Sequence, residues 1–215
     1  MLIPGLERKS PRVILCLAAH ADDIEIGCGG TLFRLLQSWP DVEVHWYVLS
    51  APGPRQREAR RSAAAWLRAA RKSHVDILEF RENYFPDHWA DIKNRMEQIR
   101  ASCDPDLIFT HWRGDLHQDH RVVSELTWNA FRRHTILEYE IPKYDGDLGN
   151  PNLYVALDQR VCRRKVATLM RLFRTQTTKS WFTEDTFFAL LRLRGIECGG
   201  RTHFAEAFYA RKLVL

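Results

Sequence analysis

Two short segments of the 215-residue chain gather side chains that can bind a metal ion or move a proton. The first, A-H-A-D-D, places His20, Asp22 and Asp23 directly after a run of apolar residues. The second, D-L-H-Q-D-H, spans residues 115–120. Imidazole and carboxylate groups are ligands that zinc favours, and both are costly to bury without a partner. The two segments therefore predict a metal site, provided that the fold brings them together.

A catalytic zinc ion needs three protein ligands and one open position. His20 and Asp23 lie three residues apart, so a tight turn can direct both toward one point. Either His117 or His120 of the second segment can complete the set. The carboxylate left over can accept a proton from water, and the remaining histidine can stabilise an oxyanion or protonate a leaving amine. The spacing leaves open which histidine binds the metal.

Each segment taken alone has an ordinary explanation. H-x-x-D and H-x-x-H pairs are common on protein surfaces, and Asp119 could simply favour the positive end of a helix dipole. His111, just before the second segment, is expected to contact a ligand and not to bind the metal itself. The functional interpretation depends on both segments following predicted strands.

The pattern of apolar residues predicts where the two segments lie. Strands are expected at residues 13–19, 42–49, 75–80, 106–110 and 135–141, and helices at 31–39, 56–71, 91–102 and 120–133. This alternation indicates an α/β fold, a Rossmann-like parallel sheet with helices on both faces. Ligands of such sheets bind beyond the carboxyl ends of the strands, and the two segments follow the first and the fourth strand.

The last third of the chain has a different pattern. Helices are expected at residues 158–174 and 183–194, and a strand at 204–213. We expect these elements to form a C-terminal cap on the same domain, so that residues 1–215 make a single domain.

Three glycines, Gly27, Gly29 and Gly30, follow the first segment. They do not form the G-x-G-x-x-G pattern of a phosphate-binding loop. We therefore expect that the backbone packs closely against its neighbours at these positions.

Composition excludes several classes of protein. No run of about 18 apolar residues could span a membrane, and residues 1–12 carry charges where a signal peptide would be apolar. The five cysteines are scattered and never form C-x-x-C, which argues against a disulfide framework or a cysteine-rich zinc site. These features predict a cytoplasmic protein.

The chain carries a formal net charge of +5, with arginine-rich clusters such as residues 60–61, 132–133 and 163–165. Clusters of this kind usually belong to a solvated helix face. They also attract anionic partners such as a phosphorylated sugar, a membrane surface or a nucleic acid. The charge alone does not choose among these partners.

The sequence resembles the LmbE-like family of N-acetylglucosaminyl de-N-acetylases, also called the PIG-L family. That family carries A-H-P-D-D after its first strand, then a G-C-G-G-T-like turn, and later H-P-D-H. The corresponding stretches here are AAHADDIEIGCGGTL and DLHQDHRVV. Weaker similarities include Arg55 with Glu58 in the second helix and Asp87 after the third strand. Ala21 and Gln118 replace family prolines, which affects the rigidity of the turns and removes no ligand.

This resemblance implies a role for each matching residue of the metal site. His20, Asp23 and His120 would hold one Zn²⁺ ion per chain, and another divalent metal is compatible with the same ligands. Asp22 would be the general base.

The resemblance also implies roles for residues around the metal. His117 would stabilise the oxyanion or act as general acid, and Asp119 would orient it. Arg55 and Asp87 would bind hydroxyl groups of the substrate.

The function implied is a zinc-dependent hydrolase that removes an N-acetyl group from an N-acetylglucosamine-type sugar or sugar conjugate. The products are acetate and a free amine. An anionic or lipid-linked form of this small substrate is compatible with the basic charge. We expect no specific nucleic-acid partner and no membrane span, and a homo-oligomer is compatible with the sequence.

Two other functions fit some of the same features. A metal-dependent phosphoesterase uses similar ligands, but such sites usually hold two metals and need more of them. A basic nucleic-acid-binding protein with a structural metal would account for the charge, but the chain has no recognisable binding motif.

Overall fold

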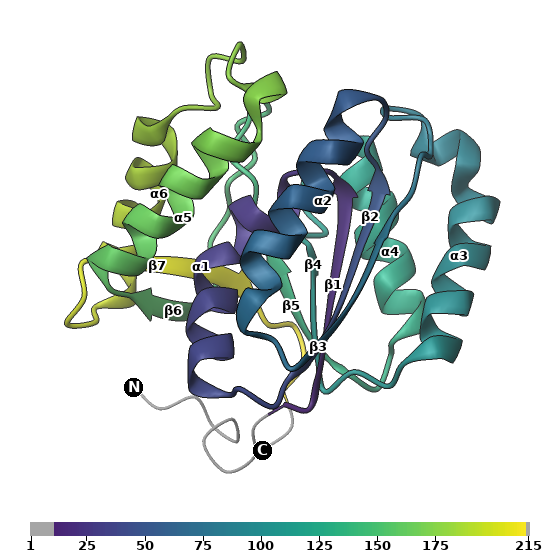
Figure 1. The fold of residues 1–215 in the computed structure, drawn as a ribbon, viewed down its shortest axis with the longest axis horizontal. Coiled ribbons are helices and arrows are strands. Elements are labelled where there is room, and N and C mark those ends of the chain that lie inside the picture. The colour runs from purple at the N-terminus through teal and green to yellow at the C-terminus, as the bar shows by residue number, and fades with distance from the viewer. Residues whose placement is uncertain (1–10, 214–215) are drawn as a thin grey trace.

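The computed structural model describes residues 11–213, which form a seven-stranded sheet with helices on both faces (Figure 1). The strands are β1 (Val13–His20), β2 (Glu43–Ser50), β3 (Lys72–Ile77), β4 (Leu107–His111), β5 (Thr135–Tyr139), β6 (Leu153–Leu157) and β7 (Phe204–Tyr209). Their order in the sheet is β3-β2-β1-β4-β5-β7-β6. Strands β1 to β5 are parallel, whereas β7 runs antiparallel to both β5 and β6. The predicted α/β class with a Rossmann-like sheet is confirmed.

Two groups of helices cover the two faces of the sheet. One face packs against α1 (Asp23–Ser38), α2 (Pro54–Trp66), α5 (Gln159–Leu172) and α6 (Glu184–Cys198). The other face packs against α3 (Trp89–Ser102) and α4 (Gln118–Ala130). Three short 3₁₀ helices connect these elements: η1 (Leu67–Ala69), η2 (Phe85–His88) and η3 (Arg174–Gln176). Across residues 11–213, no helix combines the length and the apolar character that crossing a membrane requires.

Strand β1 lies at the centre of the sheet and is buried on both faces. Ile14 and Cys16 belong to the core beneath α1, α2 and α5, while Leu15 and Leu17 belong to the core beneath α3 and α4. Because successive side chains of a strand point to opposite faces, burial on both sides requires an unbroken apolar run. The run that ends at His20 therefore fixes this strand between the two helical layers.

The observed elements extend the predicted ones in two places. Helix α1 begins at Asp23, immediately after the turn of the first polar segment, although the glycines that follow have low helix propensity. In the last third, the two predicted helices and the predicted strand, β7, are present, and β6, which was not predicted, pairs with β7 at the edge of the sheet. Strand β6 is a five-residue edge strand that carried no distinct signal in the sequence.

The glycines of α1 lie against large side chains, as the sequence predicted. A Cβ atom on Gly27 would lie 2.2 Å from the ring of Tyr139, and one on Gly29 would lie 2.6 Å from Nε1 of Trp66. Both distances are shorter than atoms can approach without displacement. Small residues therefore allow α1 to pack directly onto the sheet and onto α2.

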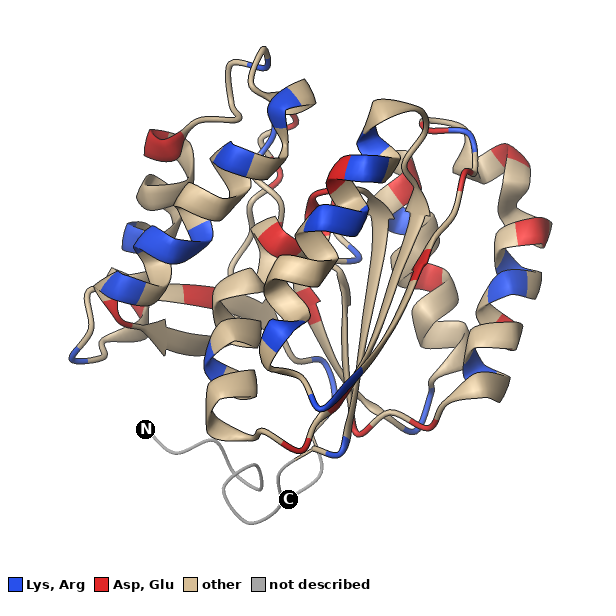
Figure 2. Ribbon diagram, viewed as in Figure 1, with Lys and Arg blue, Asp and Glu red and all other residues tan. Residues whose placement is uncertain are grey.

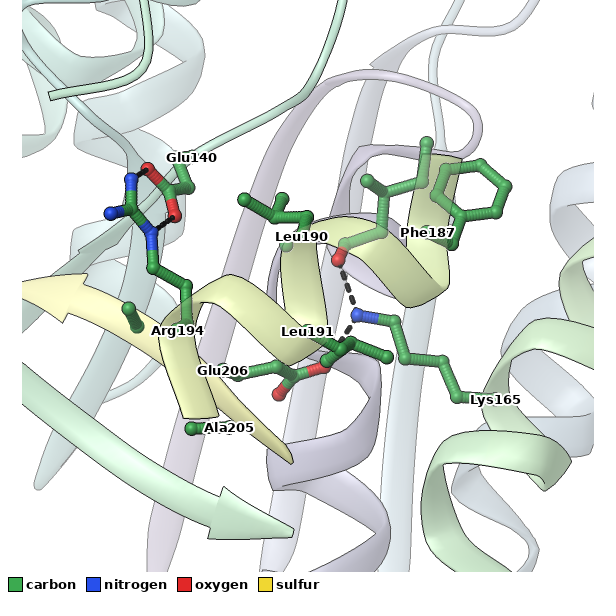
Figure 3. A pocket seen from close by; sticks show the side chains of 11 residues that line it. Glu140, Lys165, Phe187, Leu190, Leu191, Arg194, Ala205 and Glu206 are labelled. Atoms are coloured by element: carbon green, nitrogen blue, oxygen red, sulfur yellow. Dashed lines mark hydrogen bonds and ion pairs between the residues drawn. The ribbon is translucent and has the colours of Figure 1, made fainter. Parts of the chain in front are cut away.

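A buried ion pair also holds α1 in place (Figure 3). Nζ of Lys165 in α5 lies 2.6 Å from Oε1 of Glu206 in β7 and donates a hydrogen bond of 2.5 Å to the carbonyl of Ile26. The Glu206 carboxylate accepts hydrogen bonds from the backbone N–H groups of Gly30 and Thr31. Since each group finds a partner, the charges can be buried, and α1, α5 and β7 are tied together at one point.

Replacing Gly27 with alanine tests this close packing. The added methyl group must displace the Tyr139 ring, so we expect Gly27→Ala to lower the free energy of unfolding by about 1–3 kcal/mol. The greater helix propensity of alanine offsets only part of this cost. The measurement is urea-induced unfolding followed by circular dichroism, compared with the unsubstituted protein.

Gly200→Ala is the matched control. Its Cβ atom would lie 3.4 Å from Sγ of Cys198, an ordinary contact, so stability should change by less than about 0.5 kcal/mol. Equal stability of the two variants would show that α1 does not depend on this close approach.

Candidate active site

The two polar segments meet in the crevice between the carboxyl ends of β1 and β4, where the connections that follow these two strands lead to opposite faces of the sheet. Strand β1 pairs with β2 on one side and with β4 on the other, and the helices that follow β1 and β4 cover opposite faces. His20 ends β1, and His111 ends β4. This is the switch point at which doubly wound sheets bind ligands.

Three donor atoms converge in this crevice. Nδ1 of His20 lies 3.1 Å from Nε2 of His120, and Oδ2 of Asp23 lies 3.5 Å from the first atom and 3.7 Å from the second. Ligands held about 2.0–2.1 Å from one tetrahedral zinc ion would stand about 3.4 Å from each other. The three residues named by the family resemblance therefore have the spacing that a single ion requires, and all are buried.

A carboxylate holds the second ring nitrogen of each of these histidines. Oδ2 of Asp119 lies 3.0 Å from Nε2 of His20, and Oδ2 of Asp115 lies 2.9 Å from Nδ1 of His120. Such pairs fix the ring orientation and the tautomer of a metal-binding histidine. Each imidazole thus directs an unprotonated nitrogen toward the same point when it binds a cation.

The charges around these donors favour a cation. Burial lowers the pKa of His20, but hydrogen bonds with Asp119 and Asp23 outweigh it and raise this pKa to about 10. Burial and the neighbouring His111 lower the pKa of His120 to about 3. The site thus holds a neutral imidazole, His120, that is ready to bind a metal, and a second imidazole, His20, whose carboxylate neighbours favour positive charge at its position. A metal must displace the His20 proton, so its affinity should rise with pH.

The side chain of Asp119, which was predicted to orient His117, makes its hydrogen bonds with other residues. Its carboxylate contacts His20 and also accepts hydrogen bonds from the backbone N–H groups of Asn83 at 2.6 Å and Phe85 at 3.1 Å. Only the backbone of Asp119 contacts His117, by donating a 3.2 Å hydrogen bond to Nδ1 of that ring. Asp119 therefore fixes His20 and joins the loop after β3 to the site.

The environment of His117 favours the neutral form of its ring. This residue caps the N-terminus of α4, and burial and the positive charge of His20 lower its pKa below the usual value. Because Nδ1 accepts the backbone N–H, the proton of the neutral ring resides on Nε2, where it can be donated to a substrate.

Asp22 lies next to the donor triangle and is paired with Arg55. Nη2 of Arg55 donates to Oδ1 of Asp22 at 2.8 Å, and Nη1 donates to Glu82 at 2.7 Å. Burial raises the pKa of Asp22 above its usual value, and Arg55 opposes that rise. Arg55 therefore contacts the candidate base. Asp87 is exposed on η2, and its side chain makes no hydrogen bond or ion pair within residues 11–213.

Two further residues support the site. Nε2 of His111 lies 3.2 Å from Oδ2 of Asp23 and 3.0 Å from the backbone nitrogen of Ala19, so this ring contacts a candidate ligand from behind. Nζ of Lys143 lies 3.0 Å from Oδ1 of Asp115. The position of Asp115, five residues before His120, hinted at its role, but nothing in the local sequence marked Lys143.

Alternative donor sets overlap the same centre. His117 is close enough to join His20 and His120, and His111 is close enough to join Asp23 and His120. Both sets contain His120, so within residues 11–213 the candidate groups describe one metal centre.

Comparisons with known proteins identify a family for this chain and solved structures with the same fold. Residues 15–131 match the GlcNAc-PI de-N-acetylase (PIG-L) family. The uncharacterized deacetylase YaiS of Escherichia coli K12 is 30% identical over 139 residues, which cover 60% of this chain and 74% of YaiS. The N,N'-diacetylchitobiose deacetylase of Pyrococcus horikoshii has a TM-score of 0.69 at 19% identity, over 95% of this chain and 85% of that one.

A protein with another activity shares the fold. The 4-carboxy-2-hydroxymuconate hydratase GalB of Pseudomonas putida KT2440 also has a TM-score of 0.69, at 14% identity, over 95% of this chain and 98% of that one. The fold and the converging donors define a Rossmann-like α/β protein with a candidate metal centre at its switch point. The family match shows that this chain belongs to the GlcNAc-PI de-N-acetylase (PIG-L) family. Since a hydratase has the same fold, the reaction must be argued from the site.

Asp119→Asn tests whether this carboxylate fixes His20. An asparagine amide can donate to Nε2 of His20, which would leave the proton on Nδ1, the nitrogen that faces the metal position. Metal affinity should fall by about 10–100-fold. The measurement is competition between the protein and a chelator of known affinity.

The control is Asp104→Asn, which alters an exposed aspartate whose Oδ1 lies 2.9 Å from Nε2 of His134. Asp104 precedes β4, so it lies at the opposite end of this strand from His111. The metal affinity of this variant should be unchanged. If Asp119→Asn kept full metal affinity and lost only turnover, the result would favour the predicted role of Asp119, which is to orient His117.

Proposed function

We propose that this protein is a metal-dependent deacetylase that hydrolyses the N-acetyl group of an amino sugar of the N-acetylglucosamine type. The observation that most supports it is the convergence of His20, Asp23 and His120 beside Asp22, a buried carboxylate outside the ligand set. Family membership and deacetylase relatives point to the same reaction. Zinc is the metal proposed, because two imidazoles and one carboxylate match its preferred ligands.

The donor set fits a catalytic ion. His20, Asp23 and His120 would hold it, and three protein ligands leave a position for water or substrate. When bound, zinc would polarise the acetyl carbonyl and lower the pKa of water toward about 7. Although burial opposes it, the interactions of Asp23 with His120, His111 and His20 hold the pKa of this carboxylate well below its usual range, so this ligand is ionised.

Asp22 is the proposed general base. It is buried, and burial raises its pKa, which increases its tendency to take a proton from the attacking water. Arg55 holds one carboxylate oxygen through its 2.8 Å hydrogen bond and leaves the other for the water. The proton that Asp22 receives can then pass to the amine nitrogen as the C–N bond breaks, which gives acetate and a free amine.

His117 is the proposed oxyanion donor. Its neutral ring carries a proton on Nε2, and the ring centroid lies 4.9 Å from that of His20 and 4.5 Å from that of His120. A fixed N–H donor at this position stabilises the negative charge that develops on the acetyl oxygen. This assignment makes Asp22 alone responsible for moving the proton.

The direct test is a screen of N-acetylated sugars and sugar conjugates for acetate release. We expect activity that a chelator abolishes and that added zinc restores. A phosphate ester such as p-nitrophenyl phosphate serves as the control for the phosphoesterase alternative. Hydrolysis of the ester with no acetate released from any N-acetyl sugar would reject the proposed reaction.

Asp22→Asn should separate catalysis from metal binding. The substitution keeps the shape of the side chain and its hydrogen bond from Arg55 but removes its basicity. Turnover should fall by about 10²–10⁴-fold while metal content stays near that of the unsubstituted protein. The two quantities are measured by a steady-state assay and by elemental analysis.

Asp23→Ala is the companion variant. It removes one of three proposed ligands, so metal content and turnover should fall together. If Asp22→Asn lost its metal and Asp23→Ala kept it, the two roles would have to be exchanged.

Arg55→Gln should change the pH dependence of the reaction. Arg55 lowers the pKa of Asp22, so its loss should raise that pKa further. A base must be ionised to act, and the low-pH limb of kcat/KM should therefore move to higher pH. Arg57→Gln makes the same change of charge at an exposed position of α2 and should leave this limb in place. Identical profiles for both variants would contradict the proposed contact.

A further inference from the structure

Two helices of the same layer carry the same arginine pattern. Residues 57–68 and residues 160–171 both read R-x-x-R-R-x-x-A-x-x-x-R. The first stretch covers α2 and the η1 turn that continues it, and the second covers α5. Positions spaced by three, four and seven residues lie on one side of a helix, so each pattern makes one stripe.

The two stripes lie on neighbouring helices and face solvent. Helices α2 and α5 contact each other on the same face of the sheet, and Figure 2 shows basic segments on both. All eight side chains are exposed, and we refer to them as the arginine face: Arg57, Arg60, Arg61, Arg68, Arg160, Arg163, Arg164 and Arg171.

Little on these helices compensates the charge. None of the eight arginines forms an ion pair with an acidic residue of the described part of the chain, residues 11–213. Helix α5 contains no acidic residue, and the one in α2, Glu58, accepts hydrogen bonds from the backbone and the hydroxyl of Thr175. The +5 net charge of the chain is therefore concentrated, in good part, on one surface.

We propose that the arginine face binds a lipid bilayer that carries anionic headgroups. Its charges are spread over two adjacent helices and not gathered into a pocket, which suits an extended surface. The one other exposed position that the two stripes share is occupied by alanine, Ala64 in one and Ala167 in the other. The arginines are therefore not separated by an acidic side chain or by a large apolar one. Arginine pairs well with phosphate groups, and each basic residue near an anionic surface adds to the attraction.

A nucleic acid fits this surface less well. Proteins that bind single strands place aromatic side chains among the basic ones, so that bases can stack on them. The exposed aromatic residues of residues 11–213, Tyr84, Trp89 and Tyr144, all lie outside α2 and α5. Both helices also pack against α1 and against each other, and neither projects as a groove-reading helix does.

Helix α2, which carries part of the arginine face, also reaches the candidate active site. Arg55, in the first turn of α2, contacts Asp22, and Glu58 one turn later contacts Thr175 in η3, directly after α5. A bilayer bound at this face would therefore lie beside the crevice. Binding itself does not depend on the proposed reaction, because none of the eight arginines contacts the metal centre.

The test is flotation of the full chain with lipid vesicles at low ionic strength. We expect binding to vesicles of equal phosphatidylcholine and phosphatidylglycerol, and none to vesicles of phosphatidylcholine alone. Raising the ionic strength to about 1 M, where the Debye length is about 3 Å, should release the protein. Removing three charges with Arg60→Gln, Arg160→Gln and Arg163→Gln should weaken partitioning by on the order of 100-fold.

A second triple variant separates this face from net charge. Arg100→Gln, Arg132→Gln and Arg133→Gln also lower the net charge from +5 to +2, but they lie in α3 and just after α4, on the opposite layer. This control should bind anionic vesicles within a few-fold of the unsubstituted chain. Circular dichroism and thermal unfolding confirm that both variants are folded.

Four results would overturn the proposal. The first three are absence of binding to anionic vesicles, equal weakening by the two triple variants, and binding to neutral vesicles that is as strong as binding to anionic ones. A fourth is binding of duplex DNA that depends on the arginine face while anionic vesicles are not bound, which would assign the surface to nucleic acid. Acetate release from a soluble sugar should be the same in both triple variants. A failure of the membrane-binding proposal is therefore distinguishable from a failure of the proposed reaction.

Discussion

The need to compensate buried negative charge governs the candidate active site. Four aspartates lie buried around the crevice between β1 and β4, and a carboxylate in such a place requires a cation or several hydrogen bonds. Arg55 compensates Asp22, and Lys143 compensates Asp115. The other two surround His20, whose raised pKa shows how strongly this part of the crevice favours positive charge. A divalent cation held by the converging donors would satisfy the same requirement.

The positions of these donors depend on how tightly α1 is held. Asp22 and Asp23 precede and begin this helix, so any tilt of α1 moves them relative to His120. Glycines bring its backbone against the sheet, and the pair of Lys165 and Glu206 fixes it to α5 and β7. Catalytic side chains must be held within about 0.5 Å of their productive positions. The contacts that fix α1 would therefore also keep Asp22 and Asp23 in place.

The chain separates two kinds of electrostatic field. The crevice is locally acidic, which favours a metal ion, while the outer surface of α2 and α5 is strongly basic. Arg55 belongs to the helix that carries the basic stripe, yet it turns inward to Asp22. One helix therefore serves both regions: its first turn stabilises the ionised form of the proposed base, and its exposed side presents charge to the surroundings.

The parts of the structure that depend on local pattern were predictable from residue order. Unbroken apolar runs located the central strands, and polar residues after the first and fourth strands named the candidate donors, because side-chain alternation and strand direction follow directly from residue order. Which groups pair became visible in the tertiary structure. Asp119 contacts His20 across 99 positions, Lys143 reaches Asp115 from a loop, and β6 forms only because β7 offers it a partner. Such contacts depend on where distant backbones lie and on which nitrogen of a ring they face, and local spacing carries no information about either.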